Sequence, residues 1–282
     1  MWTLDRPAPT PRASFTACIS RVRNQALKAR LEGVTQAVVD ASTAFDAAAK
    51  RHALHQLGQD PLVGGTVTTK EMEKVYTQRM AKSGAPGRAI YDEIFSSSPQ
   101  GRCPLCAQRP VATLDHHLPK AHYPALAVTP LNLVPSCSDC NKAKLSAVPQ
   151  KATEVGLHPY YDEIDDEVWL AARVVETAPA ALRFHVVTPA GRDGVLAARV
   201  KNHFQTLGLG KLYASEAAEE LVNIRHQLVE MHRDGGLEVV RSELETRAAS
   251  CSLARRNGWR AATYKAWAAS DWFCDVGFAP VG

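Results

Sequence analysis

The spacing of apolar residues along the chain predicts a mostly helical protein. From Phe15 to Leu57 the sequence is rich in alanine, contains no proline and repeats its apolar residues at helical intervals. Gly33 is expected to kink or divide this helix. A further helix is predicted to begin near Thr69, because Thr68 and Glu71 have the spacing of a capping box.

The pattern after residue 150 predicts a β-hairpin followed by helices. Trp169–Val175 and Leu182–Thr188 are strand-like runs on either side of a proline-containing turn, which is typical of two antiparallel strands. From Leu196 onward the spacing is helical again, with breaks at Gly208–Gly210 and Gly235–Gly236. Together these elements indicate an α+β fold that is mostly helical.

Changes in this pattern divide the chain into three expected regions. Residues 1–100 form a helical region that ends with a helix over Arg88–Ser97, and its proline-rich first dozen residues are expected to be disordered or loosely docked. Residues 101–150 form a module rich in cysteine, proline and histidine, with a helix expected over Ser138–Ser146. Residues 151–282 form a C-terminal region that contains the hairpin and the later helices.

Composition and charge indicate an ordinary soluble protein. Apolar residues make up 45% of the 282 residues, which is enough for a core, and the formal charge of +4 does not by itself indicate a nucleic-acid partner. No apolar run approaches the roughly 20 residues that span a bilayer, and the N-terminus lacks the pattern of a signal peptide. We therefore expect a cytoplasmic protein with no membrane partner.

Four of the seven cysteines lie in two CxxC pairs. Cys103 and Cys106 form the first pair, and Cys137 and Cys140 form the second. Each CxxC turn presents two sulfurs to one ion, so two turns complete the tetrahedral shell that zinc prefers. In a chain with no export signal this spacing favours metal ligands over disulfides. We expect a structural Zn²⁺ site, because four thiolates leave no open position for water.

Residues between and after the two pairs suit the hydrolysis of a phosphodiester bond. A histidine can accept the proton of an attacking water, and a divalent cation can stabilise the charge on the leaving oxygen. Asp115, His116 and Asn141 supply the base and ligands for such a cation. Asn141 directly follows the last cysteine, so the zinc site is expected to fix its position.

The order of these elements resembles the HNH endonuclease family. The matching motifs run from Cys103 to Lys144: Cys-x-x-Cys, Asp-His-x-x-Pro-Lys, Pro-x-Asn-Leu-Val-Pro and Cys-x-x-Cys-Asn-x-x-Lys. The resemblance implies a zinc-stapled ββα-metal nuclease module, in which two strands and a helix surround one catalytic Mg²⁺ or Mn²⁺. It also implies DNA as the substrate.

The resemblance implies a role for each matching residue. His116 matches the general base, Asp115 and Asn141 match ligands of the catalytic cation, and Asn132 matches a residue that braces the loop bearing the base. A second register, in which His116 is the ligand and His117 the base, stays open, because some members of the family use a His-His pair. Lys120 and Lys144 are candidate phosphate-binding residues.

The flanks of the module extend the resemblance. Gly87–Ile94, Leu157–Asp162 and Asn202–Phe204 resemble extensions found in nuclease subunits of bacterial anti-phage systems such as Septu. This wider resemblance implies a role in antiviral defence and a partner ATPase of the SMC or ABC type. The acidic run Asp162–Glu167, by contrast, is expected to be a solvated loop.

Two classes of function compete on this sequence. One is a metal-dependent DNA endonuclease; the other is a non-catalytic zinc module that binds nucleic acid or protein. The set of Asp115, His116 and Asn141 favours the nuclease, because a binding module has no need of it. An RNA-cleaving nuclease also stays open, because hydrolysis with a histidine base does not require a 2′-hydroxyl. One module carries one site, so a double-strand cut would need a homodimer or two successive nicks.

Overall fold

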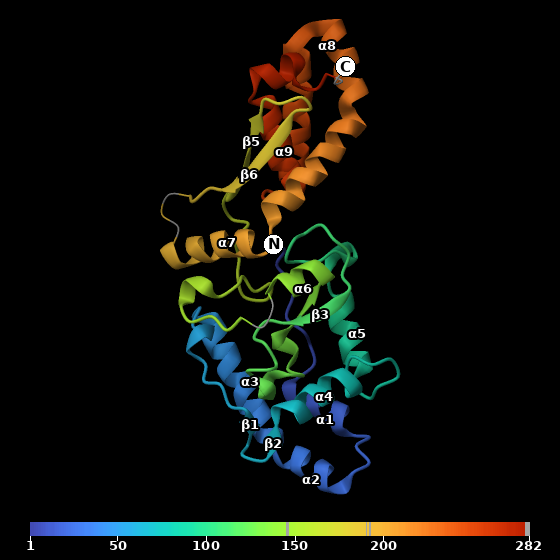
Figure 1. The fold of residues 1–282 in the computed structure, drawn as a ribbon, viewed down its shortest axis with the longest axis vertical. Coiled ribbons are helices and arrows are strands. Elements are labelled where there is room, and N and C mark those ends of the chain that lie inside the picture. The colour runs from blue at the N-terminus through green and yellow to red at the C-terminus, as the bar shows by residue number, and fades with distance from the viewer. Residues whose placement is uncertain (145–146, 190, 192, 280–282) are drawn as a thin grey trace. The chain divides into compact units, whose positions relative to one another are not determined.

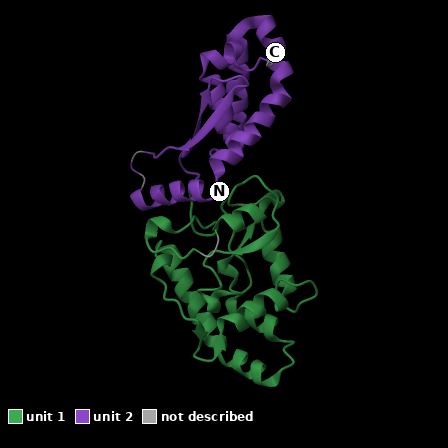
Figure 2. Cartoon of the chain, in the orientation of Figure 1, with its two compact units in different colours: residues 1–163 green, residues 164–282 purple. Residues whose placement is uncertain are grey.

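The computed structural model describes residues 1–144, 147–189, 191 and 193–279. It divides into two compact units, residues 1–163 and residues 164–282 (Figure 2). The fold is α+β and mostly helical, as the pattern predicts, and its described strands form three two-stranded antiparallel sheets.

Unit 1 contains the cysteine and histidine motifs together with the helices that precede them (Figure 1). Its helices and strands are α1 (Pro11–Ile19), α2 (Gln25–Gly33), α3 (Thr35–Lys50), β1 (Leu62–Val63), β2 (Val67–Thr68), α4 (Thr69–Arg79), α5 (Arg88–Ser96), β3 (Thr113–His116), β4 (Leu133–Ser136) and α6 (Ser138–Lys144). Single 3-10 turns join them at Leu54–Gln56, Pro99–Gly101, Pro124–Leu126, Pro130–Asn132 and Ala152–Glu154.

Local signals locate several of these helices correctly. The capping box is present at the start of α4, where the Thr68 side chain accepts from the Glu71 N–H and the Glu71 carboxylate accepts from the Thr68 N–H at 2.9 Å. α5 begins at Arg88, as expected. The helix expected over Ser138–Ser146 begins at Ser138 and is described as far as Lys144; Ser146 lies outside the described residues.

The long helix expected over Phe15–Leu57 is three helices. Gly33 is the last residue of α2, so the division expected there is present. A second break separates α1 from α2, because Asn24 has extended backbone angles and its side chain accepts a hydrogen bond from the Leu27 N–H at 2.9 Å. An asparagine in this position caps a new helix rather than continuing the preceding one.

The cysteine and histidine module shares its core with the N-terminal helices. One buried cluster joins Phe15 and Tyr76 from α1 and α4 to Leu114 and Leu133 from β3 and β4. A second joins Phe45 of α3 to residues of the loop between the two strands. The structure therefore makes residues 1–163 one compact unit, whereas the sequence pattern suggests boundaries at residues 100 and 150.

The N-terminal segment is docked, which corrects the expectation of disorder or loose docking. The Trp2 N–H donates to the Pro104 carbonyl at 2.8 Å, and the Leu4 N–H donates to the Pro159 carbonyl at 2.9 Å. Met1 and Leu4 are both buried. Proline-rich composition was a poor guide here, because two backbone hydrogen bonds and two apolar side chains hold the segment.

Unit 2 packs a β-hairpin against two helices, so that the first strand contacts α9 and the second contacts α8 (Figure 1). The hairpin is present as expected, and the elements of this unit are β5 (Leu170–Val175), β6 (Ala181–Val186), α7 (Gly194–Thr206), α8 (Leu209–Ala254), α9 (Trp259–Ala268) and a π-helical turn at Phe273–Gly277. Both predicted glycine breaks are present, because Gly208 and Gly236 have positive φ angles of 61° and 70°. Gly236 divides α8 into two arms, which are joined by a 2.6 Å hydrogen bond from Arg247 to Gln227.

The acidic run is solvated at Glu163, Asp165 and Asp166, as expected, whereas its first residue and parts of its backbone are held in place. The Asp162 side chain is buried and accepts from the His158 N–H at 2.6 Å. Further along, the Asn257 amide donates to the carbonyls of Ile164 and Glu167 and accepts from the Trp169 N–H at 2.8 Å. Asn257 thus ties the segment leading into β5 to the turn between α8 and α9.

Among the described residues, no helix combines the length and the apolar character that crossing a membrane requires.

Replacement of Asn257 by alanine is expected to destabilise unit 2. The change leaves the N–H of the buried Trp169 and the neighbouring carbonyls without their partner, which should lower the free energy of unfolding by about 2–3 kcal/mol. Urea unfolding followed by tryptophan fluorescence measures this, because every tryptophan except Trp2 lies after residue 164. The control is Asn223→Ala, an exposed position on α8, with an expected change within about 0.5 kcal/mol. Equal losses in the two variants would contradict the role of Asn257.

Candidate active site and metal centre

The four paired cysteines converge on one point. Their Sγ atoms all lie within 4.8 Å of one another, and the four residues are buried. The Sγ atoms of Cys106 and Cys137 are 4.0 Å apart. A zinc ion with Zn–S bonds of about 2.3 Å needs sulfurs about 3.8 Å apart. The donor set and its spacing therefore fit one tetrahedral Zn²⁺.

Both CxxC turns have backbone N–H groups directed at sulfur. The Arg109 N–H donates to the Cys106 sulfur at 3.5 Å, and the Cys140 N–H donates to the Cys137 sulfur at 3.4 Å. Hydrogen bonding from Cys103, with a contribution from the Arg109 N–H, lowers the pKa of Cys106 to about 7. Hydrogen bonds from the other three cysteines lower the pKa of Cys137 as well. Hydrogen bonding among the same four sulfurs raises the pKa of Cys103 and Cys140, so the surroundings favour the thiolate form at Cys106 and Cys137 alone.

The second pair links the sheet to the helix that follows it. β3 and β4 are antiparallel, with Asp115 opposite Val134 and His116 opposite Leu133. Cys137 comes directly after β4, and Cys140 lies in α6. The cysteine cluster therefore fixes α6 against the end of β4, and two strands followed by a helix frame the candidate site.

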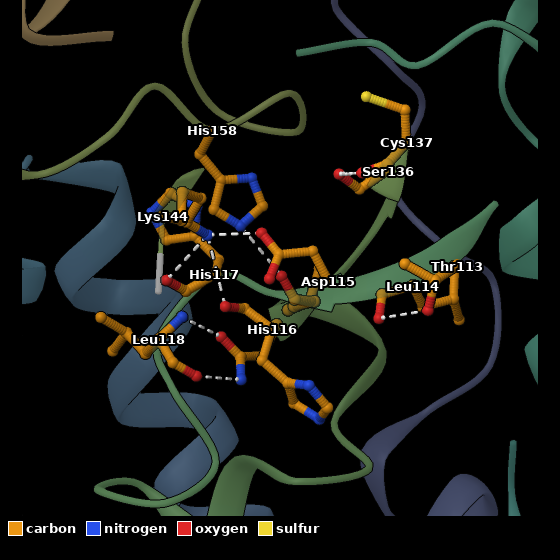
Figure 3. A network of polar contacts seen from close by, with 12 residues as sticks. Thr113, Leu114, Asp115, His116, His117, Leu118, Ser136, Cys137, Lys144 and His158 are labelled. Carbon is orange, nitrogen blue, oxygen red and sulfur yellow. Dashed lines mark hydrogen bonds and ion pairs between the residues drawn. The ribbon is translucent and has the colours of Figure 1, made fainter. Parts of the chain in front are cut away.

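The Asp115 carboxylate holds the ammonium group of Lys144 within this frame. Lys144 Nζ lies 2.7 Å from Asp115 Oδ2, and it donates to the carbonyl oxygens of His116 and His117 at 3.3 Å each (Figure 3). Asp115 is only 6% exposed. One carboxylate oxygen and two carbonyl oxygens thus surround a positive charge, and oxygens of these kinds are the ligands that Mg²⁺ and Mn²⁺ take.

The ring of His116 lies on the other side of β3 from the Asp115 carboxylate (Figure 3). Its Nε2 is 2.8 Å from the carbonyl oxygen of Ala127, and its ring packs edge-on against Tyr76 with centroids 4.4 Å apart. A carbonyl can only accept, so Nε2 carries the proton and Nδ1 carries the lone pair. Burial, with the nearby charge of Lys120, lowers the pKa of His116 to about 3, so the ring is neutral.

His117 packs against a second histidine from beyond the motif. The rings of His117 and His158 have centroids 4.2 Å apart and are both buried. His158 Nδ1 accepts from the Tyr160 N–H at 3.2 Å, so His158 Nε2 donates to the Leu131 carbonyl at 3.0 Å. Both ring nitrogens of His158 therefore have backbone partners.

Asn132 holds the loop that follows the two histidines. Its side-chain oxygen accepts from the Leu118 N–H at 2.7 Å, and its NH₂ group donates to the Leu118 carbonyl at 3.0 Å and the Leu126 carbonyl at 3.3 Å. Its backbone carbonyl accepts from the His117 N–H at 2.8 Å. Asn132 is fully buried, and its hydrogen bonds hold the loop segment from Leu118 to Leu126 in place.

The remaining candidates lie around this frame. Asn141 lies three residues before Lys144 on α6 and is half-buried, so the two share a side of the helix. Lys120 Nζ lies over the Tyr76 ring, 5.6 Å from its centroid. The structure thus brings Asp115, Lys144 and the backbone carbonyls of His116 and His117 together. Asn132 and the His116 ring make their own contacts outside that cluster.

Tyr76 is the contact that sequence reasoning missed. Its hydroxyl donates to the Leu114 carbonyl on β3 at 3.1 Å while its ring packs on His116. Burial raises the pKa of Tyr76 above its ordinary value, so the hydroxyl stays protonated and able to donate. The helical spacing of α4 indicates that Tyr76 is a core residue, but it carries no signal of this partner, which lies 38 residues further along the chain.

Comparisons with known proteins give one relative of uninformative name. The chain is 34% identical over 198 residues to "Protein ea31" of Escherichia phage lambda, a match that covers 68% of this chain. The chain spans 64% of the length of that relative. No family model and no solved structure matches the chain.

Replacement of Cys137 by serine is expected to remove zinc. The purified protein should contain about one Zn²⁺ per chain, and Cys137→Ser should lose most of it and unfold at a lower temperature, because three thiolates no longer close the shell. Elemental analysis and thermal unfolding measure the two effects. Cys251→Ser, on α8 in unit 2, serves as the control and should retain its zinc. Equal zinc in all three proteins would show that the cluster is not the zinc site.

Proposed function

We propose that the chain is a metal-dependent endonuclease of the HNH type that hydrolyses phosphodiester bonds of DNA. The observation that carries the proposal is the group of three oxygens around Lys144 Nζ at the end of β3. One belongs to the Asp115 carboxylate, and the other two are the backbone carbonyl oxygens of His116 and His117. A buried carboxylate needs a compensating cation. In this proposal a divalent cation takes that position in the active enzyme, with Asp115 and Asn141 as its protein ligands.

The bound cation would stabilise the negative charge on the leaving oxygen and on the phosphate. His116 acts as the base: Nε2 is held by the Ala127 carbonyl, so Nδ1 is left as the nitrogen that accepts the proton of water. Asn132 fixes the loop after the histidines, and Tyr76 fixes the His116 ring. Lys144, released from Asp115, and Lys120 contact the phosphate.

His117 is the second candidate for the base. Asp115 and His117 are two residues apart, so they lie on the same side of an extended chain, whereas His116 lies on the other. The ring of His117 packs against that of His158, with centroids 4.2 Å apart. We favour His116 because its tautomer is fixed, and the paired variants below separate the two assignments.

The biological role rests on the resemblance of the flanking segments. It carries the proposal of a bacterial anti-phage nuclease that works with an SMC-like or ABC-like ATPase. A non-catalytic zinc module that binds nucleic acid or protein, and an RNA-cleaving nuclease, are the alternatives. A module that only binds has no need to bury Asp115 against Lys144, and this contact favours catalysis.

Replacement of His116 by alanine is expected to abolish cleavage and to leave zinc content unchanged. Supercoiled plasmid is incubated with Mg²⁺ or Mn²⁺, and loss of a general base should reduce the rate by about 10²-fold or more. The control is His122→Ala, which replaces a half-buried histidine two residues after the Asp115–Lys120 motif and should cleave normally. If His117→Ala abolished cleavage while His116→Ala retained it, the base would be His117. Normal cleavage by both variants would contradict either assignment.

Replacement of Lys144 by methionine is expected to strengthen the binding of Mn²⁺. The change keeps the length of the side chain and removes the ammonium group that lies among the three oxygens. Loss of a charged hydrogen bond worth about 1.5 kcal/mol should raise the affinity on the order of tenfold. Titration of Mn²⁺ followed by electron paramagnetic resonance measures this without any cleavage.

The exposed neighbour Lys142→Met is the control for that titration, and its affinity should equal that of the parent. Asp115→Asn should weaken binding. Unchanged affinity in Lys144→Met would mean that the lysine does not occupy the position of the cation.

A further inference from the structure

The β5–β6 hairpin of unit 2 has one buried face and one exposed face. Leu170, Leu182 and Phe184 are buried on the face that packs against α8 and α9. On the other face Arg173 lies directly opposite Arg183. Both arginines are exposed, and the hairpin stands at the edge of its unit (Figure 1).

Two arginines in this position are unfavourable for the isolated protein. Like charges directly opposite one another on neighbouring strands destabilise a sheet. Neither arginine has an ion-pair partner among the residues that the structure describes, and the turn residue Glu176 is not joined to either of them. By contrast, Arg241 and Arg260 of the same unit pair with Asp271 and Glu220. The charge of the two guanidinium groups is therefore not neutralised by an ion pair within the described residues.

His185 extends the same exposed face. It lies two residues after Arg183 on β6, opposite Ala171, so its ring projects on the same side as the two arginines. His185 is exposed, whereas its neighbours Phe184 and Leu182 are buried. The face thus presents two guanidinium groups and one imidazole, all of which donate hydrogen bonds to anions.

We propose that this exposed face of the β5–β6 hairpin binds the sugar-phosphate backbone of duplex DNA. The proposal rests on the proposed nuclease function and assigns substrate binding to unit 2. A two-stranded antiparallel ribbon fits the major groove of B-form DNA, which is about 12 Å wide. The major groove of A-form RNA is deep and narrow, so the same ribbon does not enter it. Arginine is the side chain best suited to grip a phosphate with two parallel hydrogen bonds.

The test is the binding of a short fluorescent DNA duplex to the full chain, followed by anisotropy. The parent carries His116→Ala and no divalent cation is added, so cleavage does not interfere. Arg173→Gln/Arg183→Gln is expected to bind on the order of tenfold more weakly. The slope of log affinity against log salt should become shallower by about 2, because each lost phosphate contact removes about 0.9.

The matched control is Arg21→Gln/Arg23→Gln, which removes two exposed arginines from unit 1 and changes the net charge equally. It should bind like the parent. Arg173→Lys/Arg183→Lys keeps the charge and should retain most of the affinity, and this result guards against simple misfolding of the hairpin. Unfolding curves of all variants should coincide within about 1 kcal/mol.

Three results would overturn the proposal. Unchanged affinity in Arg173→Gln/Arg183→Gln would mean that the hairpin does not touch DNA. Equal losses in that variant and in Arg21→Gln/Arg23→Gln would show an effect of net charge alone. If Arg173→Gln/Arg183→Gln lost as much affinity for duplex RNA as for duplex DNA, the hairpin would not be selective for DNA. The outcome is separate from catalysis, because a chain that needs these arginines for binding and never cleaves would contradict only the nuclease proposal.

Discussion

The convergence of four cysteine sulfurs is the constraint on which the rest of the site depends. One pair lies in the turn after residue 101, and the other joins the end of β4 to the start of α6. Holding these sulfurs within 4.8 Å sets the position of α6, and with it Asn141 and Lys144, relative to β3. A structural zinc ion in a small module contributes on the order of 10 kcal/mol, which is comparable to the whole stability of a typical domain.

Charge inside this frame is balanced in a way that suits a metal. Asp115 is nearly inaccessible to water, so its negative charge needs a cation close by. Lys144 meets that need and is in turn held by two carbonyl oxygens. Either an ammonium group or a divalent cation can balance the negative charge of the buried Asp115 carboxylate. On the other side of the strand the surroundings of His116 disfavour a charge. Burial of the ring, which packs against Tyr76, lowers its pKa and keeps it neutral.

The sequence predicts the features that depend on short stretches of chain. The capping box at Thr68, the hairpin and the break at Gly236 are all present, because each follows from a few neighbouring residues. The convergence of the two CxxC pairs is also present, and it was predicted because four cysteines at this spacing complete the shell of one zinc ion. Contacts between distant segments could not be predicted in this way. The packing of Tyr76 on His116, the docking of Leu4 beside Pro159 and the burial of Asp162 depend on how whole helices and loops pack. The break before α2 was signalled by Asn24, a good helix cap, whose effect the alanine-rich pattern concealed.

The most direct test of the account is a crystal structure of the protein with Mn²⁺, with anomalous data collected at the zinc and manganese absorption edges. The account predicts a zinc peak among the sulfurs of Cys103, Cys106, Cys137 and Cys140, and a separate manganese peak about 2.2 Å from the Asp115 carboxylate, with Lys144 Nζ displaced. The contrary result is a zinc peak alone, with Lys144 still paired to Asp115 at saturating Mn²⁺. That result would leave a zinc-stapled frame without a second metal site and would contradict the proposed catalytic centre.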